Sequence, residues 1–267
     1  ISNSISITAD AFNNLSDAAS SVITLFGFHL SGKKPDPDHP FGHGRIEYLS
    51  GLAVSIMIFV MGFELLQSSI NKIINPEPME PSILVGVIMV ASIIIKFYMA
   101  YYNSKIGKKI DSAAMMSVAT DSISDTISTF VVLLSMIFYH ITDINIDPYA
   151  GLLVSLLILY AGCNSAKETI SPLLGRAPDP NFVLAIEEIV RQQCHIVGIH
   201  DLIVHDYGPG RVFVSLHAEV PGNEDIYMLH DEIDNAERAL QELLQCHAII
   251  HMDPVSTDDD EMNAIKQ

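Results

Sequence analysis

Five stretches of this chain are apolar and long enough to cross a lipid bilayer. They cover residues 4–30, 49–71, 82–104, 113–139 and 148–171, and each is near the ~20 residues that a spanning helix needs. In the bilayer core every backbone polar group must be paired within the segment, so such stretches fold as helices. We therefore predict an α-helical membrane domain over residues 1–175.

Two of these stretches each carry a pair of polar side chains four residues apart. The pairs are Asn13 with Asp17 and Asp121 with Asp125, and positions i and i+4 share one face of a helix. An aspartate at the bilayer centre costs ~2.5–3.5 kcal/mol on insertion scales. Helix packing is the alternative explanation, but it usually uses Ser, Thr, Asn or Gln. Hard oxygen ligands from two helices instead indicate a divalent cation site, so we predict that these four residues form it.

Charge is distributed unevenly along the chain. Residues 1–177 hold 14 Asp and Glu against 10 Lys and Arg, whereas residues 178–267 hold 18 against 4. This acidity argues against a nucleic-acid partner, since phosphate contacts require Lys and Arg. Basic residues flank the apolar stretches mainly on one side, which the positive-inside rule places in the cytoplasm. These residues are Lys33, Lys34, Arg45, Lys105, Lys108, Lys109 and Arg176.

The same orientation puts the acidic C-terminal part in the cytoplasm and makes the first apolar stretch begin outside. We therefore expect at least one further spanning helix ahead of residue 1. The C-terminal part follows a Pro-marked linker and alternates helical with strand patterns. The expected order is a helix at 182–195, strands at 199–208 and 210–220, a helix at 225–245 and a strand at 247–254. That order predicts a small α+β domain over 176–255, and 256–267 is expected to be a disordered acidic tail.

Histidine and aspartate recur in two further places. The loop between the first two apolar stretches contains Asp36, His39 and His43, which is either a metal-binding loop or a turn with solvated side chains. The C-terminal part contains a second set, and we predict that its members bind metal in the cytoplasm. This set is His200, His217, His230, His251 and Asp253. His251 and Asp253 are two apart on an expected strand and so face one side.

Taken together, these residues resemble the cation diffusion facilitator family of divalent metal/proton antiporters. The resemblance rests on the segment Asp10–Asp17, the Asp121-Ser-Ile-Ser-Asp125 pair, the Asp36–Gly44 loop and the C-terminal His and Asp motifs, and it spans residues 4–255. It implies six membrane helices, with the first preceding this chain, and a ferredoxin-like αββαβ cytoplasmic domain. It also implies a homodimer in the plasma membrane and alternating access driven by protons.

The chain departs from the zinc exporters of that family, which typically carry His in one or both intramembrane pairs. Oxygen-only ligands suit hard ions, so we expect a secondary active exporter of Mn²⁺, with Fe²⁺, Zn²⁺ or Cd²⁺ as further cargo, rather than an enzyme. Two alternatives come from other classes. One is a membrane scaffold that senses metal without transporting it. The other is an intramembrane aspartyl protease, whose Gly-x-Gly-Asp motif does not occur beside the three buried aspartates.

Overall fold

A computed structural model describes residues 19–76 and 83–256 of the chain. These residues divide into two compact units. The first takes the chain up to Lys34 and then His43–Leu173, and the second takes Pro35–Gly42 and the chain from Leu174 onward. Each unit has its own hydrophobic core.

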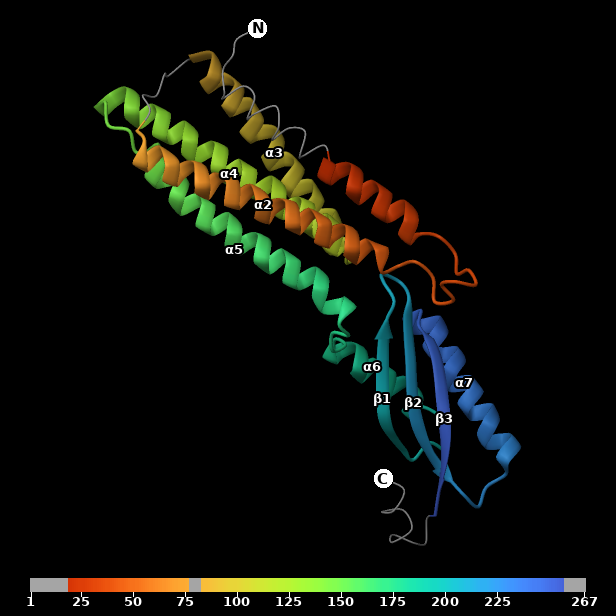
Figure 1. The fold of residues 1–267 in the computed structure, drawn as a ribbon. Coiled ribbons are helices and arrows are strands. Elements are labelled where there is room, and N and C mark those ends of the chain that lie inside the picture. Colours follow the sequence, from red (N-terminus) through yellow and green to blue (C-terminus); the bar gives the residue numbers. More distant parts are fainter. Residues whose placement is uncertain (1–18, 77–82, 257–267) are drawn as a thin grey trace. The chain divides into compact units, whose positions relative to one another are not determined.

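The first unit is a bundle of long apolar helices (Figure 1). Among the described residues, four helices are long and apolar enough to span a membrane, namely α2 (Ile46–Ile74), α3 (Ile83–Ile110), α4 (Ala113–Thr142) and α5 (Asp147–Leu173). A shorter apolar helix runs over Ala19–Ser31. Many large apolar side chains on these helices are exposed, as expected of surfaces that face lipid. The chain is a multi-pass membrane protein.

Four of the five apolar stretches are confirmed as helices, and each helix is longer than its apolar stretch. The largest extension at one end is in α3, which continues through Lys109 to Ile110. A run of apolar residues marks only the part of a helix inside hydrocarbon, whereas the helical backbone continues into the polar interface. The first stretch, 4–30, begins in residues outside the described ranges.

Close backbone packing joins α2 to α5. A Cβ atom added at Gly162 would lie 3.1 Å from the backbone N of Phe59, and one added at Gly62 would lie 3.1 Å from the backbone N of Leu159. Each helix thus uses a glycine to admit the other's main chain, which is how membrane helices gain van der Waals contact.

A buried hydroxyl cluster connects α2, α4 and α5. Ser55 lies 2.9 Å from Ser165 and 3.3 Å from Ser117, and Ser165 donates to Ser117 at 3.0 Å, all measured between Oγ atoms. Hydrogen bonds between serines are a common means of holding membrane helices together. This cluster fixes the three helices around the core formed by Val54, Ile58 and their neighbours.

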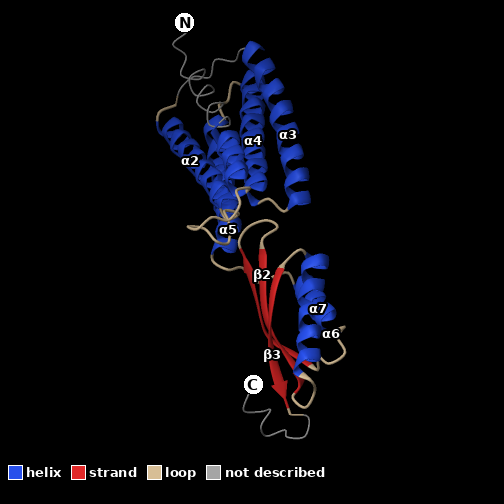
Figure 2. Cartoon of the chain, turned by 90° about the vertical axis from the view of Figure 1, so that its right-hand side faces the viewer, coloured by secondary structure: helices blue, strands red, loops and turns tan. Residues whose placement is uncertain are grey.

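The second unit is a two-layer α+β fold, as predicted. Its elements are α6 (Pro180–Arg191), β1 (Gly198–Asp206), β2 (Val212–Pro221), α7 (Ile226–Leu244) and β3 (His247–Val255). The sheet order is β1-β2-β3, with β1 antiparallel and β3 parallel to the central β2. Figure 2 shows the helices beside the sheet, and they pack on one of its faces.

Alternation along the strands decides which side chains reach that core. On β2, Val214, Leu216, Ala218 and Val220 are buried, and the residues between them are only partly buried. The buried set packs with apolar residues of α6 and α7. Side chains at the alternate positions therefore project from the opposite face of the sheet, which neither helix covers.

Candidate functional site

Both carboxylates of the predicted pair on α4 are buried inside the membrane unit. Asp121 and Asp125 are each 4% exposed, and they lie one turn apart on the same helix. The helix begins after Ser112, whose hydroxyl accepts a hydrogen bond from the backbone N–H of Met115 at 3.1 Å. Such a cap pairs a donor that the first turn leaves free. The N-terminus of α4 is thus capped, and the helix places both carboxylates inside the bundle.

The helix that follows the first polar pair contacts the second pair. Ser20, on the helix Ala19–Ser31, donates its hydroxyl to Oδ2 of Asp121 at 3.1 Å. Ser20 lies three residues after Asp17 in the sequence. Asn13 and Asp17 themselves lie outside the described residues. The convergence of the four predicted ligands therefore stays a prediction, which the contact at Ser20 supports.

A buried lysine, which was not among the predicted site residues, lies beside Asp125. Nζ of Lys96, on α3, is 2.7 Å from Oδ2 of Asp125, and the two side chains are only 8% and 4% exposed. Buried charges persist when they are paired, so this ion pair explains how a lysine is retained in the middle of an apolar helix. Its signal in the sequence is a lone charge within the stretch 82–104.

The second unit gathers three histidines and an aspartate on the face of the sheet away from its helices. Strand register aligns His200 with His217, and His217 with His251. The imidazole rings of neighbouring strands are 5.2 Å and 4.7 Å apart between centroids. One row of imidazoles therefore crosses all three strands. The sequence predicted these residues as ligands, and the sheet brings them side by side.

Asp253, on the edge strand β3, contacts all three imidazoles of this row. Its carboxylate is 2.9 Å from Nδ1 of His217, 3.1 Å from Nε2 of His200 and 3.3 Å from Nε2 of His251. The hydrogen bond from His217 is the main reason that the pKa of Asp253 lies below its usual value, and the other two imidazoles add to the effect. The side chain is thus an ionised carboxylate. Ligand atoms of His217, His251 and Asp253 lie within 4.8 Å of one another, which suits a single metal ion.

A β-bulge on β1 puts His200 in this row. The register of β1 on β2 shifts between His200 and Ile203, and Asp201 there has a φ of 50°. The extra residue changes the alternation, so Ile199 and Leu202 both pack against the core although they are three residues apart. His200, between them, faces outward. Sequence periodicity carries no signal for this shift.

The remaining predicted ligands are His230 and three residues of the loop, Asp36, His39 and His43. His230 lies on α7, 65% exposed, with its Nδ1 3.7 Å from Asp234, and the structure of this chain does not bring it to the row on the sheet. Asp36 and His39 form an exposed turn in which Oδ1 of Asp36 accepts the backbone N–H of His39 at 2.7 Å. His43, the third predicted loop ligand, belongs to the first unit.

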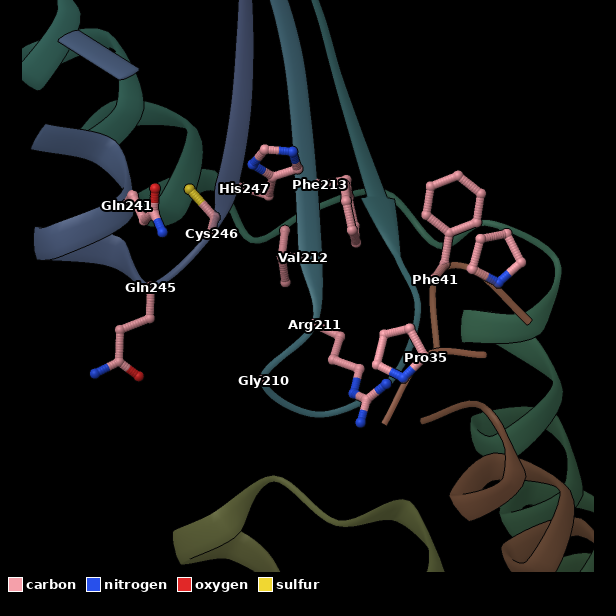
Figure 3. Close-up of a pocket in the computed structure, with 11 residues that line it drawn as sticks. Pro35, Phe41, Gly210, Arg211, Val212, Phe213, Gln241, Gln245, Cys246 and His247 are labelled. Atoms are coloured by element: carbon pink, nitrogen blue, oxygen red, sulfur yellow. The ribbon is translucent and has the colours of Figure 1, made fainter. Parts of the chain in front are cut away.

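The same loop segment contributes to a cavity of about 600 Å³ in the second unit (Figure 3). Phe41 stacks on Tyr207 at 4.5 Å between centroids and meets Phe213 edge-on. Arg211 and His247 also line the cavity. None of the described residues that line it is an aspartate or glutamate, so it lacks the carboxylates found in the pair on α4 and in the row on the sheet.

Comparison with known proteins agrees with both units. The family model for the cation efflux transmembrane domain matches residues 1–174, and that for the cytoplasmic domain of cation efflux proteins matches residues 178–255. The chain belongs to the cation efflux family. This family is the cation diffusion facilitator family that the sequence motifs resemble, and its members are transporters rather than enzymes.

Individual cation efflux proteins are similar over most of their length. An uncharacterized transporter of Methanocaldococcus jannaschii is 31% identical over 88% of this chain and 87% of its own. The manganese efflux system protein MneS of Bacillus subtilis is 28% identical over 93% and 86%, and the cation-efflux pump FieF of Cronobacter sakazakii is 30% identical over 95% and 84%. A solved structure of CzrB, studied as a zinc transporter, matches 30% of this chain and all of its own at 26% identity, with a TM-score of 0.28.

If the row of imidazoles and Asp253 binds metal, metal should stabilise the second unit of this cation efflux protein. Residues 177–267 contain the whole core of the second unit, and we expect them to fold when expressed alone. Metal that binds only the folded state stabilises it by ~2.7 kcal/mol at about 100 times its Kd. Mn²⁺ or Zn²⁺ should therefore raise the melting temperature of this fragment, and His251→Ala should remove most of the increase.

His205→Ala is the matched control, because His205 lies on β1 outside the Asp253 cluster. It should keep the full metal-dependent increase. A folded fragment whose melting curve is unchanged by either metal would contradict the assignment of the cluster as a metal site.

An ion pair between His195 and Glu232 should make the stability of the second unit depend on pH. Nδ1 of His195 is 2.7 Å from Oε1 of Glu232, and the backbone N–H of His195 donates to Oε2 at 2.8 Å. The hydrogen bond to Glu232 raises the pKa of His195 above its ordinary 6.5. Burial acts to raise the pKa of Glu232, but the hydrogen bonds from His195 outweigh it and bring that pKa below 4.5. In the folded protein both side chains are thus charged between pH 4.5 and pH 6.5.

The pair of His195 and Glu232 should stabilise the folded unit most in the pH range where both side chains are charged. The contribution of His195 is fully present below pH 6.5 and is lost as pH rises through the higher pKa of the folded state. The contribution of Glu232 is present above pH 4.5 and is lost as pH falls through its lower one. Glu232→Gln should therefore lower the melting temperature of the fragment more at pH 6 than at pH 9. Glu242→Gln, on the exposed side of α7, should show no such difference, and an equal loss at both pH values for Glu232→Gln would contradict the argument.

Proposed function

We propose that this cation efflux protein exports a divalent transition metal from the cytoplasm, with Mn²⁺ as its main cargo, in exchange for protons. The observation that carries the proposal is the buried carboxylate pair of Asp121 and Asp125 on α4, together with the contact from Ser20. Carboxylates are kept in a membrane bundle at a high cost. A cargo that needs oxygen ligands accounts for that cost.

The transport site in this proposal consists of Asn13, Asp17, Asp121 and Asp125. These side chains offer one amide oxygen and three carboxylates, without imidazole or thiolate. Such a set suits Mn²⁺ better than Zn²⁺, which prefers nitrogen and sulfur ligands. The similarity to a manganese efflux protein of Bacillus subtilis supports the same cargo. Affinity for a given site is nevertheless higher for Zn²⁺ than for Mn²⁺, so some transport of Zn²⁺, Fe²⁺ or Cd²⁺ accompanies it.

Protons couple to the metal through the same ligands. A carboxylate binds either a proton or a cation, and a bound metal ion favours the ionised form. Alternating exposure of one site to the two sides then exchanges protons for metal without a separate proton path. We propose that the protein works as a homodimer in the plasma membrane. Residues 1–175 would form the transport domain and residues 176–255 a cytoplasmic domain that binds metal and dimerises. The expected tail begins at residue 256, and residues 257–267 lie outside the described ranges.

Asp125→Asn should abolish metal flux. The change removes the charge and one ligand oxygen while keeping the size of the side chain, so the loss reports ligation rather than packing. The measurement is Mn²⁺ uptake into sealed, inside-out vesicles driven by a pH gradient. Asp143→Asn is the matched control, because Asp143 is an exposed residue at the end of the same helix with a φ of 56°, and Asn tolerates that conformation. Wild-type flux in Asp125→Asn would refute the transport site, and absence of flux in the wild type would favour the metal-sensing scaffold.

Replacing Asn13 and Asp121 together by His should change the cargo. Two imidazoles added to two carboxylates form a donor set typical of Zn²⁺. The ratio of Zn²⁺ to Mn²⁺ transport should then rise by about tenfold or more, which corresponds to ~1.4 kcal/mol of relative affinity. Flux of both ions is measured on wild type and variant. A wild-type protein that moves Zn²⁺ but not Mn²⁺ would overturn the choice of manganese and leave the export function standing.

A further inference from the structure

The ion pair between Lys96 and Asp125 is a feature that the transport mechanism above does not use. Nζ of Lys96 is 2.7 Å from Oδ2 of Asp125, and the two side chains are 8% and 4% exposed. The ammonium group thus lies on a carboxylate to which the proposed cargo would bind. Lys96 comes from α3, whereas the proposed ligands come from α4 and from the chain before Ala19.

A second lysine–aspartate pair in the same unit shows that such a pair need not have a buried lysine. Nζ of Lys72 is 3.0 Å from Oδ2 of Asp147, where the end of α2 meets the start of α5. The side chain of Lys72 is 45% exposed, so that lysine reaches solvent. Lys96 has its charge enclosed among helices, and its pairing with Asp125 is therefore the more costly one.

Charge repulsion makes the ammonium group and a divalent cation competitors. Both would lie within a few ångströms of one carboxylate, and repulsion between two cations is stronger inside a protein than in water. The lysine stem is a flexible chain of four carbons, so a change of its rotamers can carry the ammonium group away from Asp125 while α3 stays in place. Cargo that binds Asp125 must therefore displace Lys96.

We propose that Lys96 is a tethered counter-ion that occupies Asp125 when the site is free of metal and competes with the cargo for it. This inference rests on the proposed function. The competition weakens metal binding and promotes release, because the returning ammonium group replaces the departing ion. Lys96 acts through Asp125 and does not ligate the metal, so it sets the affinity of the site.

Loss of the positive charge should alter affinity and turnover in opposite directions. In Lys96→Met, the apparent KM for Mn²⁺ should fall by about tenfold or more, in line with the coupling of close charge pairs, while the maximal rate should also fall. Lys96→Arg keeps the charge and should keep a KM near that of the wild type. Lys72→Met removes a lysine from the other ion pair and should leave the KM unchanged.

The assay is initial Mn²⁺ flux against Mn²⁺ concentration in vesicles of matched protein content, with Asp125→Asn as the inactive reference. A KM that is unchanged or higher in an assembled Lys96→Met protein overturns the role of Lys96 while wild-type flux upholds the export function. A wild-type protein without flux of any divalent metal overturns the proposed function itself.

Wild-type protein provides an independent measurement should Lys96→Met fail to assemble. A small membrane-permeant amine reagent should modify Lys96 several-fold faster when Mn²⁺ is present, because the ammonium group is then released from Asp125. Peptide mass spectrometry identifies the site, and Lys72 serves as the internal reference. Equal modification of Lys96 with and without Mn²⁺ overturns the proposal.

Discussion

Buried charge in an apolar bundle is the constraint on which the membrane unit depends. Helices that face lipid can hold carboxylates only in their interior and only with partners. Asp121 is met by a hydroxyl from Ser20, and Asp125 by the ammonium group of Lys96. These polar contacts add to the packing of α3 and of the helix Ala19–Ser31 against α4.

The two clusters of this chain use different ligand chemistry in different surroundings. The pair on α4 is carboxylate only and is enclosed by helices. The row on the sheet combines three imidazoles with one carboxylate and is partly open to solvent. Imidazole favours zinc-like ions, and carboxylate oxygen favours harder ones. One protein thus has a hard and a softer candidate site, and the two need not prefer the same ion.

Much of this arrangement was accessible from periodicity and residue type. Runs of apolar residues located α2 to α5, and alternation along β3 predicted that His251 and Asp253 share a face. The parts that were not predicted depend on contacts between distant segments. The pairing of Lys96 with Asp125 links two helices, and the bulge at Asp201 is a local shift of the backbone; no periodic pattern encodes either one. His230 was predicted as a member of the C-terminal set of ligands, and it lies on α7 with a side chain that is 65% exposed.

The backbone contact between α2 and α5 has a mechanical consequence. The two glycines bring the main chains of α2 and α5 into close contact, and the side chains of Ile58, Ile158 and Leu159 pack around them. Sliding one helix along the other would break these contacts. The serine cluster adds directional bonds to the same interface. α2, α4 and α5 are thus held together by close packing and hydrogen bonds, whereas α3 packs mainly on α4. The contact between α3 and α4 is therefore the place where the shape of the bundle can change with the least loss of these interactions.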